Sequence, residues 1–270
     1  MTTELWGVDF SSAPGARKPI VVARGVRAGN VLRLQGLEAI ASLAGFEALL
    51  AAAGPWLGAF DFPFGLPRAF VQSQGLGASA QEVVEEVHLR CSTRMAFRSL
   101  VDAWGQTQPA GQRLLHRVTD TALPGVRSTS PLQTRYVPVG FMYYEGFSRL
   151  VGAGVHLPGL RPADLHRCAL EGYPGLLAHE LIGRRSYKND SSSERLLARK
   201  DIVEALEQGR TRLGLRLKLT PAQAGALVAD ASGDRLDAVL CLAQAAWASV
   251  QPAYGQPVGV DALEGWITSA

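Results

Sequence analysis

Apolar runs near the start of the chain predict β-strands. Residues 5–10 form a short apolar run, as expected for a buried strand. Residues 19–26 and 31–37 predict two further strands, and the Arg-Ala-Gly-Asn stretch between them suits a hairpin turn. Residues 56–62 are almost wholly apolar as far as Asp61, which is typical of a central strand buried on both faces. We therefore expect three antiparallel strands, a connecting segment and then a buried fourth strand.

Helical spacing of apolar residues describes most of the remaining chain. Residues 38–53 predict a helix that a Gly-Pro pair ends, and residues 168–173 predict another short strand. Further helices are expected at 176–182, 193–208, 221–230 and 234–250. Ser193 is expected to cap the second of these, and Thr220 with Pro221 to begin the third. This order predicts an α/β fold whose mixed sheet has three antiparallel strands first and parallel strands afterwards, flanked by helices.

The stretch after the fourth strand interrupts this pattern. Three breakers, Pro63, Gly65 and Pro67, come first, and residues 68–160 show mainly helical and irregular patterns. With 270 residues, 47% of them hydrophobic, the chain is long enough to bury one large core. We therefore expect a single domain over residues 1–270, with a mainly helical insertion at 68–160.

Arginines are concentrated in this insertion. Residues 90–149 contain eight arginines against only three acids, a balance that suits a polyanion such as nucleic acid. Arg94 and Arg98 are four residues apart, as are Arg113 and Arg117, so each pair would share one face of a helix. We expect these four residues to contact nucleic acid beside the active centre. The alternative is that they face solvent from a lobe that only covers apolar surface.

The cysteines, the N-terminal residues and the apolar tracts indicate where in the cell the protein is expected. The three cysteines lie far apart without CxxC spacing, so neither a disulfide framework nor a zinc site is indicated, and a reducing cytoplasm is the expected location. The N-terminus lacks the pattern of a signal peptide. The longest apolar tract, at residues 238–250, is shorter than the roughly 20 residues that a membrane-spanning helix needs. No membrane association is therefore expected.

Two acids lie within apolar strands. Asp9 ends the first predicted strand, and Asp61 lies near the end of the fourth. A buried carboxylate costs several kcal/mol unless it is paired or bound to a metal, and oxygen ligands suit Mg²⁺ or Mn²⁺. If the two strands are neighbours, the acids would face each other at one sheet edge and bind such an ion. Alternatively, each acid only caps the loop that follows it.

A third acidic feature begins the last predicted helix. Asp234 and Asp237 are three residues apart and therefore lie on roughly one face. Acids at a helix start also interact favourably with the helix dipole, and Asp234 is the expected N-cap. Asp237 lies one turn further in, next to an apolar face, so we favour a metal ligand there and keep Asp234 as an additional candidate.

The motifs around these acids, taken in order, resemble a known family. They are Gly-Val-Asp-Phe-Ser, Phe-Asp-Phe-Pro-Phe-Gly-Leu-Pro, Glu-Gly-Tyr-Pro, Ser-Tyr-Lys and Gly-Asp-Arg-Leu-Asp-Ala-Val. Together they look like the DUF429 family of predicted nucleases with a ribonuclease H-like fold. The last motif is also similar to that of Holliday-junction resolvases, whose catalytic acids lie on the first strand, the fourth strand and the last helix. Asp9, Asp61 and Asp237 occupy those three places.

The resemblance implies a metal-dependent nuclease that hydrolyses phosphodiesters with two ions about 4 Å apart. Asp9 would bridge both ions, and Asp61 and Asp237 would each hold one. Glu171, which ends an apolar strand, is a candidate fourth acid, with a surface ion pair to an arginine as the alternative. Lys188 could reach a phosphate as a point charge, or remain an ordinary solvated lysine.

Two other classes of protein remain open at this point. Actin-like ATPases and sugar kinases share the related fold, but they need a second, duplicated lobe for which the chain has little room. A non-catalytic nucleic-acid-binding module would keep the basic insertion, but it would not need acids that repel a polyanion. Metal-dependent cleavage separates the nuclease from both alternatives.

Overall fold

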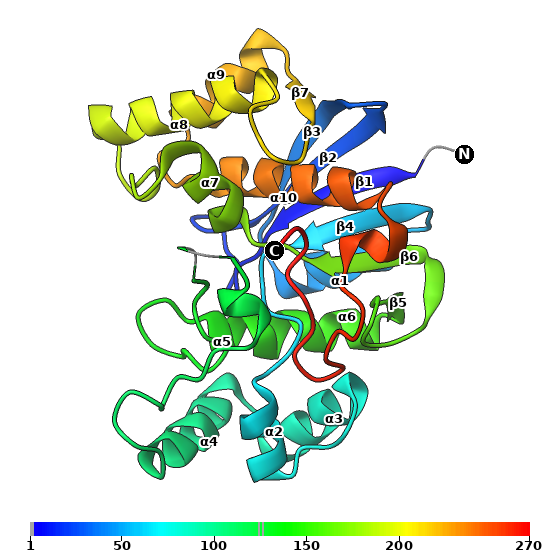
Figure 1. Cartoon of the computed structure of the whole chain (residues 1–270), viewed down its shortest axis with the longest axis vertical. Helices are drawn as coiled ribbons and strands as arrows, with labels where there is room; N and C mark the ends of the chain where they lie inside the picture. The colour runs from blue at the N-terminus through cyan, green and yellow to red at the C-terminus, as the bar shows by residue number, and fades with distance from the viewer. Residues whose placement is uncertain (1–2, 124, 126) are drawn as a thin grey trace.

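The computed structural model describes residues 3–123, 125 and 127–270. A seven-stranded mixed sheet runs through the molecule in the order β5-β6-β4-β1-β2-β3-β7 (Figure 1). The strands are β1 (Glu4–Asp9), β2 (Ile20–Ala28), β3 (Val31–Ile40), β4 (Trp56–Phe60), β5 (Val155–His156), β6 (Asp164–Glu171) and β7 (Arg216–Lys218). β1, β2 and β3 pair antiparallel, whereas β4, β6, β5 and β7 each pair parallel to a neighbour. The predicted α/β class and mixed sheet are confirmed.

Helices cover both faces of this sheet (Figure 1). One face carries α7 (Pro174–Ile182), α8 (Ser193–Glu207), α9 (Pro221–Ala229) and α10 (Asp234–Ala248). On the side of the other face, α1 (Leu43–Leu50) and α6 (Ser148–Gly152) lie next to the sheet. Beyond them lie α2 (Arg68–Gln74), α3 (Ala80–Arg90) and α4 (Arg94–Gln106), and α5 (Val139–Met142) precedes the π-helical η2 (Tyr143–Phe147) (Figure 1). The described part of the chain also contains the short helical turns η1 (Thr119–Thr121) and η3 (Pro252–Gly255).

Several predicted boundaries were wrong. The helix expected from residue 38 begins only at Leu43, because β3 continues to Ile40 and the Ser42 hydroxyl then caps α1 by accepting a hydrogen bond from the amide of Gly45. Ser193 does not cap α8: it is the first helical residue, and Ser192 precedes it without a side-chain cap bond. The capping of α9 by Thr220 is confirmed. β5 and β7 were not predicted, because strands of two and three residues show too little alternation.

The helices at residues 68–160 share one hydrophobic core with the sheet. Phe70 of α2 and Phe97 of α4 are fully buried in the same hydrophobic cluster as Val8 of β1 and Phe60 of β4. A second hydrophobic cluster lies on the opposite face of the sheet. It contains residues of α7, α8, α9 and α10 together with residues on the other side of β1 and β2. The sheet is therefore enclosed between two cores. Among the described residues, no helix combines the length and apolarity needed to cross a bilayer.

One close approach fixes α10 on β1. A Cβ atom added to Gly7 would lie 2.0 Å from the carbonyl oxygen of Ala238 and 2.1 Å from the amide nitrogen of Leu242. Only glycine allows backbone to approach so closely. This contact brings the first turn of α10 beside the end of β1, where Asp9 lies.

Candidate metal centre

Two carboxylates of the centre come from adjacent parallel strands. Asp9 is the last residue of β1, and Asp61 directly follows β4. Val8 pairs with Phe60, and the Asp61 amide donates to the carbonyl of Val8 at 2.8 Å. Because parallel strands end at the same sheet edge, this register places both acids side by side. The neighbouring strand residues are buried and apolar, so the acids are held at a fixed position.

The third carboxylate, Asp237, comes from the first turn of α10 and is fully buried. Ligand atoms of Asp9, Asp61 and Asp237 all lie within 4.8 Å of one another. Two oxygens on opposite sides of a Mg²⁺ ion, each at about 2.1 Å, are about 4.2 Å apart. The three carboxylates would therefore have to move only slightly closer together to bind one divalent cation.

The described side chains supply little positive charge to offset the negative charge of these three carboxylates. Burial raises the pKa of Asp9 well above its usual value, and Asp61 and Asp234 raise it further. Burial also raises the pKa of Asp61 to about 6, although Lys188 opposes the increase. In addition, the buried Oδ2 atom of Asp237 has only the Lys188 ammonium as a polar partner within the described structure. Hard oxygen donors crowded in this way fit Mg²⁺ or Mn²⁺.

Lys188 and Tyr187 contact Asp237 from the loop between α7 and α8. The Lys188 ammonium forms an ion pair with Oδ2 of Asp237, and the Tyr187 hydroxyl donates to Oδ1 at 2.5 Å. Lys188 is thus more than a solvated side chain, although 34% of it remains exposed. Arg199 of α8 holds this loop, since its buried guanidinium donates to the carbonyl oxygens of Tyr187 and Asp190.

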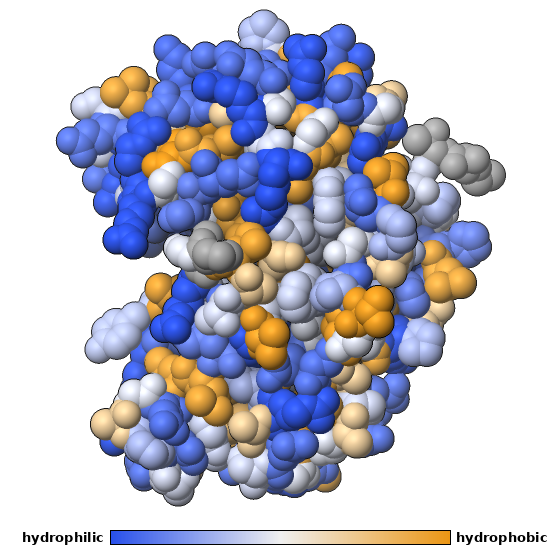
Figure 2. All heavy atoms as spheres, viewed as in Figure 1, coloured by the Kyte–Doolittle hydropathy of each residue, from blue (hydrophilic) through white to orange (hydrophobic). Residues whose placement is uncertain are grey.

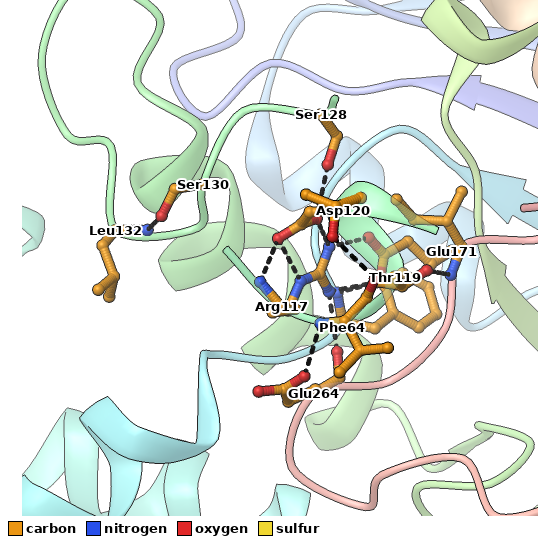
Figure 3. Close-up of polar contacts among 12 residues, drawn as sticks. Phe64, Arg117, Thr119, Asp120, Ser128, Ser130, Leu132, Glu171 and Glu264 are labelled. Carbon is orange, nitrogen blue, oxygen red and sulfur yellow. Dashed lines mark hydrogen bonds and ion pairs between the residues drawn. The ribbon is translucent and has the colours of Figure 1, made fainter. Parts of the chain in front are cut away.

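Glu171 lies close to the centre but is occupied by another partner. Both of its oxygens accept hydrogen bonds from Arg117, at 2.6 and 2.8 Å, and Phe64 donates its amide to the same carboxylate (Figure 3). Asp120 binds the other side of Arg117, and Ser128 donates to Asp120. Glu171, the candidate fourth acid, is thus engaged by Arg117 and Phe64 and lies outside the group of converging carboxylates. The alternative, an arginine pair, is present but buried rather than on the surface.

This network also corrects the role predicted for Arg117. Arg113 and Arg117 lie on an irregular segment between α4 and η1 rather than on a helix. Arg117 is 1% exposed and cannot reach a ligand on the surface, whereas Arg113 is exposed. Burial alone would lower the pKa of Arg117, but Glu171 and Asp120 outweigh it and raise the pKa above its usual value.

The other predicted residues lie around the centre. Arg94 and Arg98 share one face of α4, as expected, and both stack on Phe141. Arg94 also donates to the carbonyl of Ser12 in the loop after Asp9. Asp234 is not the N-cap of α10, which is Gly233. Its carboxylate raises the pKa of Asp9 and Asp61, but it lies outside the group of converging ligands.

A cavity of about 180 Å³ opens beside the acids. Asp61 and Lys188 line it on the side of the centre, and Arg117 and Glu171 belong to its wall. Its remaining lining is mostly apolar or uncharged: Phe62, Pro63, Ser128, Thr129, Val137, Val139, Met142, Gly172, Tyr173 and Ile267. The arrangement provides room for a small group next to the carboxylates.

Comparison of the chain with known protein families, curated proteins and solved structures found no match. The resemblance to predicted nucleases therefore stays a prediction. Sequence reasoning missed Tyr187 and the Arg117 network. Tyr187 adjoins Lys188 in the quoted Ser-Tyr-Lys motif, so that motif was a usable signal for it. No local pattern indicated that Arg117, Asp120 and Glu171 would meet in the interior.

Proposed function

We propose that this protein is a metal-dependent phosphodiesterase of the nuclease class, with Mg²⁺ or Mn²⁺ held by Asp9, Asp61 and Asp237. The observation that supports this proposal best is the convergence of three carboxylates within 4.8 Å at the end of two adjacent strands. A buried cluster of like charges is costly without a counter-charge. Lys188 supplies one positive charge, which leaves the cluster short of compensation.

The chain's own groups have distinct roles in this proposal. When bound, divalent cations supply the Lewis acidity that promotes attack of water on a phosphodiester and offsets the charge that develops. Asp9 and Asp61 offer rigid oxygen ligands from strands, and Tyr187 fixes the orientation of the Asp237 carboxylate through its hydrogen bond. Lys188, at the cavity wall, presents a positive charge to a phosphate that enters the cavity.

We also propose that the fold is ribonuclease H-like and that the chain belongs with the DUF429 family. Three antiparallel strands followed by parallel ones, with acids on β1, after β4 and on α10, support this assignment. The kinase or ATPase alternative is less well supported. It requires a duplicated lobe, and the described residues form a single sheet with its helices.

The direct test is hydrolysis of bis(p-nitrophenyl) phosphate and of labelled oligonucleotides in Mn²⁺ or Mg²⁺, with EDTA as control. We expect cation-dependent cleavage that Asp9→Asn and Asp237→Asn each reduce by at least about a hundredfold, with the melting temperature retained. Asp164→Asn, in an exposed ion pair far along β6, is a matched control that should keep wild-type activity.

Three results would count against this function. Cleavage that persists in EDTA would remove the metal from the mechanism. Turnover of a nucleoside triphosphate without phosphodiester cleavage would favour the kinase or ATPase class. Nucleic-acid binding without either reaction would leave a binding module.

A further inference from the structure

A second hollow adjoins the candidate centre on the side of α7. It is a groove of about 290 Å³, lined by one side of α7, by residues of the loop that follows it, and by Gly125 and Arg127. Figure 2 shows the molecular surface indented on its left side, at the level where Figure 1 places α7 above α5. The predicted arginine pairs did not point to this groove, whose lining includes none of their four residues.

The groove is strongly basic. Arg127, Arg184 and Arg185 line it together with His179, and none of the described residues that line it is an acid. All three arginines are exposed. Arg185 forms one surface ion pair with Asp201, while Arg127 and Arg184 form none within the described part of the chain. Exposed guanidinium groups without acid partners are suited to binding phosphates.

The groove leads to the carboxylates. Tyr173 lines both the groove and the cavity beside Asp61, and Tyr187, which contacts Asp237, lines the groove. Lys188 follows Tyr187 and lines the cavity. Positive charge and aromatic side chains thus extend from the surface of α7 to the candidate centre. Tyr187 is buried, whereas Tyr173 is partly exposed, so the Tyr173 ring can stack on a base while the basic groups bind phosphates, as in proteins that bind single strands.

We propose that this groove binds the phosphate backbone of a single nucleic-acid strand and directs it into the cavity beside Asp61. The proposal rests on the proposed function, whose substrate class it narrows. The groove and the cavity are each small, at about 290 and 180 Å³. A duplex, whose major groove alone is about 12 Å wide, could only lie across the opening. In this proposal the bound nucleic-acid strand therefore runs along α7 and not past Arg113 and Arg117.

The test uses a fluorescein-labelled single-stranded oligonucleotide, with binding followed by anisotropy over a range of salt concentrations in EDTA. EDTA separates binding from cleavage. The groove variant is Arg127→Gln with Arg184→Gln and Arg185→Gln. The control variant removes the same charge at the far sheet edge, through Arg33→Gln, Arg216→Gln and Lys218→Gln on β3 and β7.

We expect the groove variant to bind at least about tenfold more weakly at low salt. Its slope of log affinity against log salt concentration should fall by about 2, since each phosphate contact on a single strand contributes about 0.7. Arg184→Gln alone should lower the slope by about 0.7. The control variant should match the wild type, and circular dichroism should show the same melting temperature for all variants.

Equal binding by the groove and control variants would overturn the proposal. So would a wild-type protein that binds a duplex of the same sequence more tightly than the single strand, or one that binds no oligonucleotide. These results are distinguishable from failure of the proposed function, because hydrolysis of bis(p-nitrophenyl) phosphate in Mn²⁺ reports on the carboxylates without the groove.

Discussion

Asp61 shows how the environment of a single residue decides its chemistry. Its carboxyl group is partly buried at the strand ends and neighbours other acids, so its pKa is raised to about 6. In an unfolded chain the same group would titrate near 3.8. A proton therefore competes with a metal ion for this ligand in the mildly acidic range.

The raised pKa predicts a pH-dependent metal affinity. Mn²⁺ affinity, measured by calorimetric titration, should fall by more than about tenfold between pH 7.5 and pH 5, because protonated Asp61 cannot bind a cation. Asp61→Asn should bind Mn²⁺ weakly at both pH values. A wild-type affinity that is constant over this range would contradict the role of Asp61 as a ligand.

Stability without metal should change in the opposite direction. Because the folded-state pKa of Asp61 is above its unfolded value, its proton stabilises the fold below about pH 4, and this contribution is lost as the pH rises through about 6. In EDTA, Asp61→Asn should therefore exceed the wild type by about 1–3 kcal/mol in free energy of unfolding at pH 7.5. The difference should shrink toward pH 4. If denaturant titrations show that the free energy of unfolding depends on pH with the same slope in both proteins, this prediction is wrong.

Lys188 is the other residue whose effect can be isolated. Its ammonium group occupies Oδ2 of Asp237, so a metal ion must displace it from that oxygen. We expect Lys188→Gln to bind Mn²⁺ about tenfold more tightly, equivalent to about 1.4 kcal/mol, while cleaving a phosphodiester more slowly. Lys200→Gln, an exposed lysine on α8, is the matched control. Weaker Mn²⁺ binding by Lys188→Gln would show that the lysine supports the ligands rather than competing with the ion.

At the scale of elements, the packing of α10 on β1 decides whether the ligands meet. Asp237 is carried on a helix that is buried along most of its length, and a ligand on a packed helix is held more rigidly than one on a loop. The register of this helix on β1 depends on the close approach at Gly7.

Gly7→Ala should therefore damage fold and centre together. The added methyl group has no space against the α10 backbone, so we expect a loss of about 3 kcal/mol or more in free energy of unfolding and weaker Mn²⁺ binding by the remaining folded protein. Gly36→Ala, in β3, is the control, since its added Cβ would meet nothing within 4 Å. Similar stability of the two variants would mean that α10 can move away from β1 without cost.

The predictability of these elements depended on their length and pattern. The strands that carry Asp9 and Asp61 are continuous apolar runs, and α10 has a full apolar stripe, so sequence alone located all three elements and their acids. The end of β3 was missed because residues 38–40 are consistent with either element. The Ser-Tyr-Lys motif marks Tyr187, but its contact with Asp237 depends on a loop that the buried Arg199 holds, and the motif alone does not predict that contact.

For the whole molecule, the Arg117 network joins three distant parts of the chain. Arg117 and Asp120 belong to the region after α4, Glu171 ends β6, and Glu264 belongs to the C-terminal segment. The carbonyl of Glu264 accepts from Arg117, and its carboxylate accepts from the amides of Val118 and Arg68. Sequence reasoning treated Arg117 as a surface residue because partners so far apart along the chain leave no spacing signal.

Arg117→Met should be strongly destabilising. Removing one partner leaves Glu171 and Asp120 as unpaired buried acids, which typically costs 3–5 kcal/mol, and denaturant unfolding would measure the loss. Arg113→Met, at the exposed arginine of the same predicted pair, should stay within about 0.5 kcal/mol of the wild type. Equal effects of the two substitutions would contradict the buried structural role of Arg117 and would support the surface role that its sequence spacing suggested.

The same network has a consequence for the growing polypeptide. Ribosomes add Glu264 long after Arg117, so in the nascent chain the Arg117 guanidinium lacks its carbonyl acceptor, and the amides of Arg68 and Val118 lack their carboxylate acceptor. Until the C-terminal segment arrives, the wall of the cavity beside Asp61 stays incomplete. Because synthesis proceeds from the N-terminus to the C-terminus, this wall can be completed only after the C-terminal segment has emerged from the ribosome.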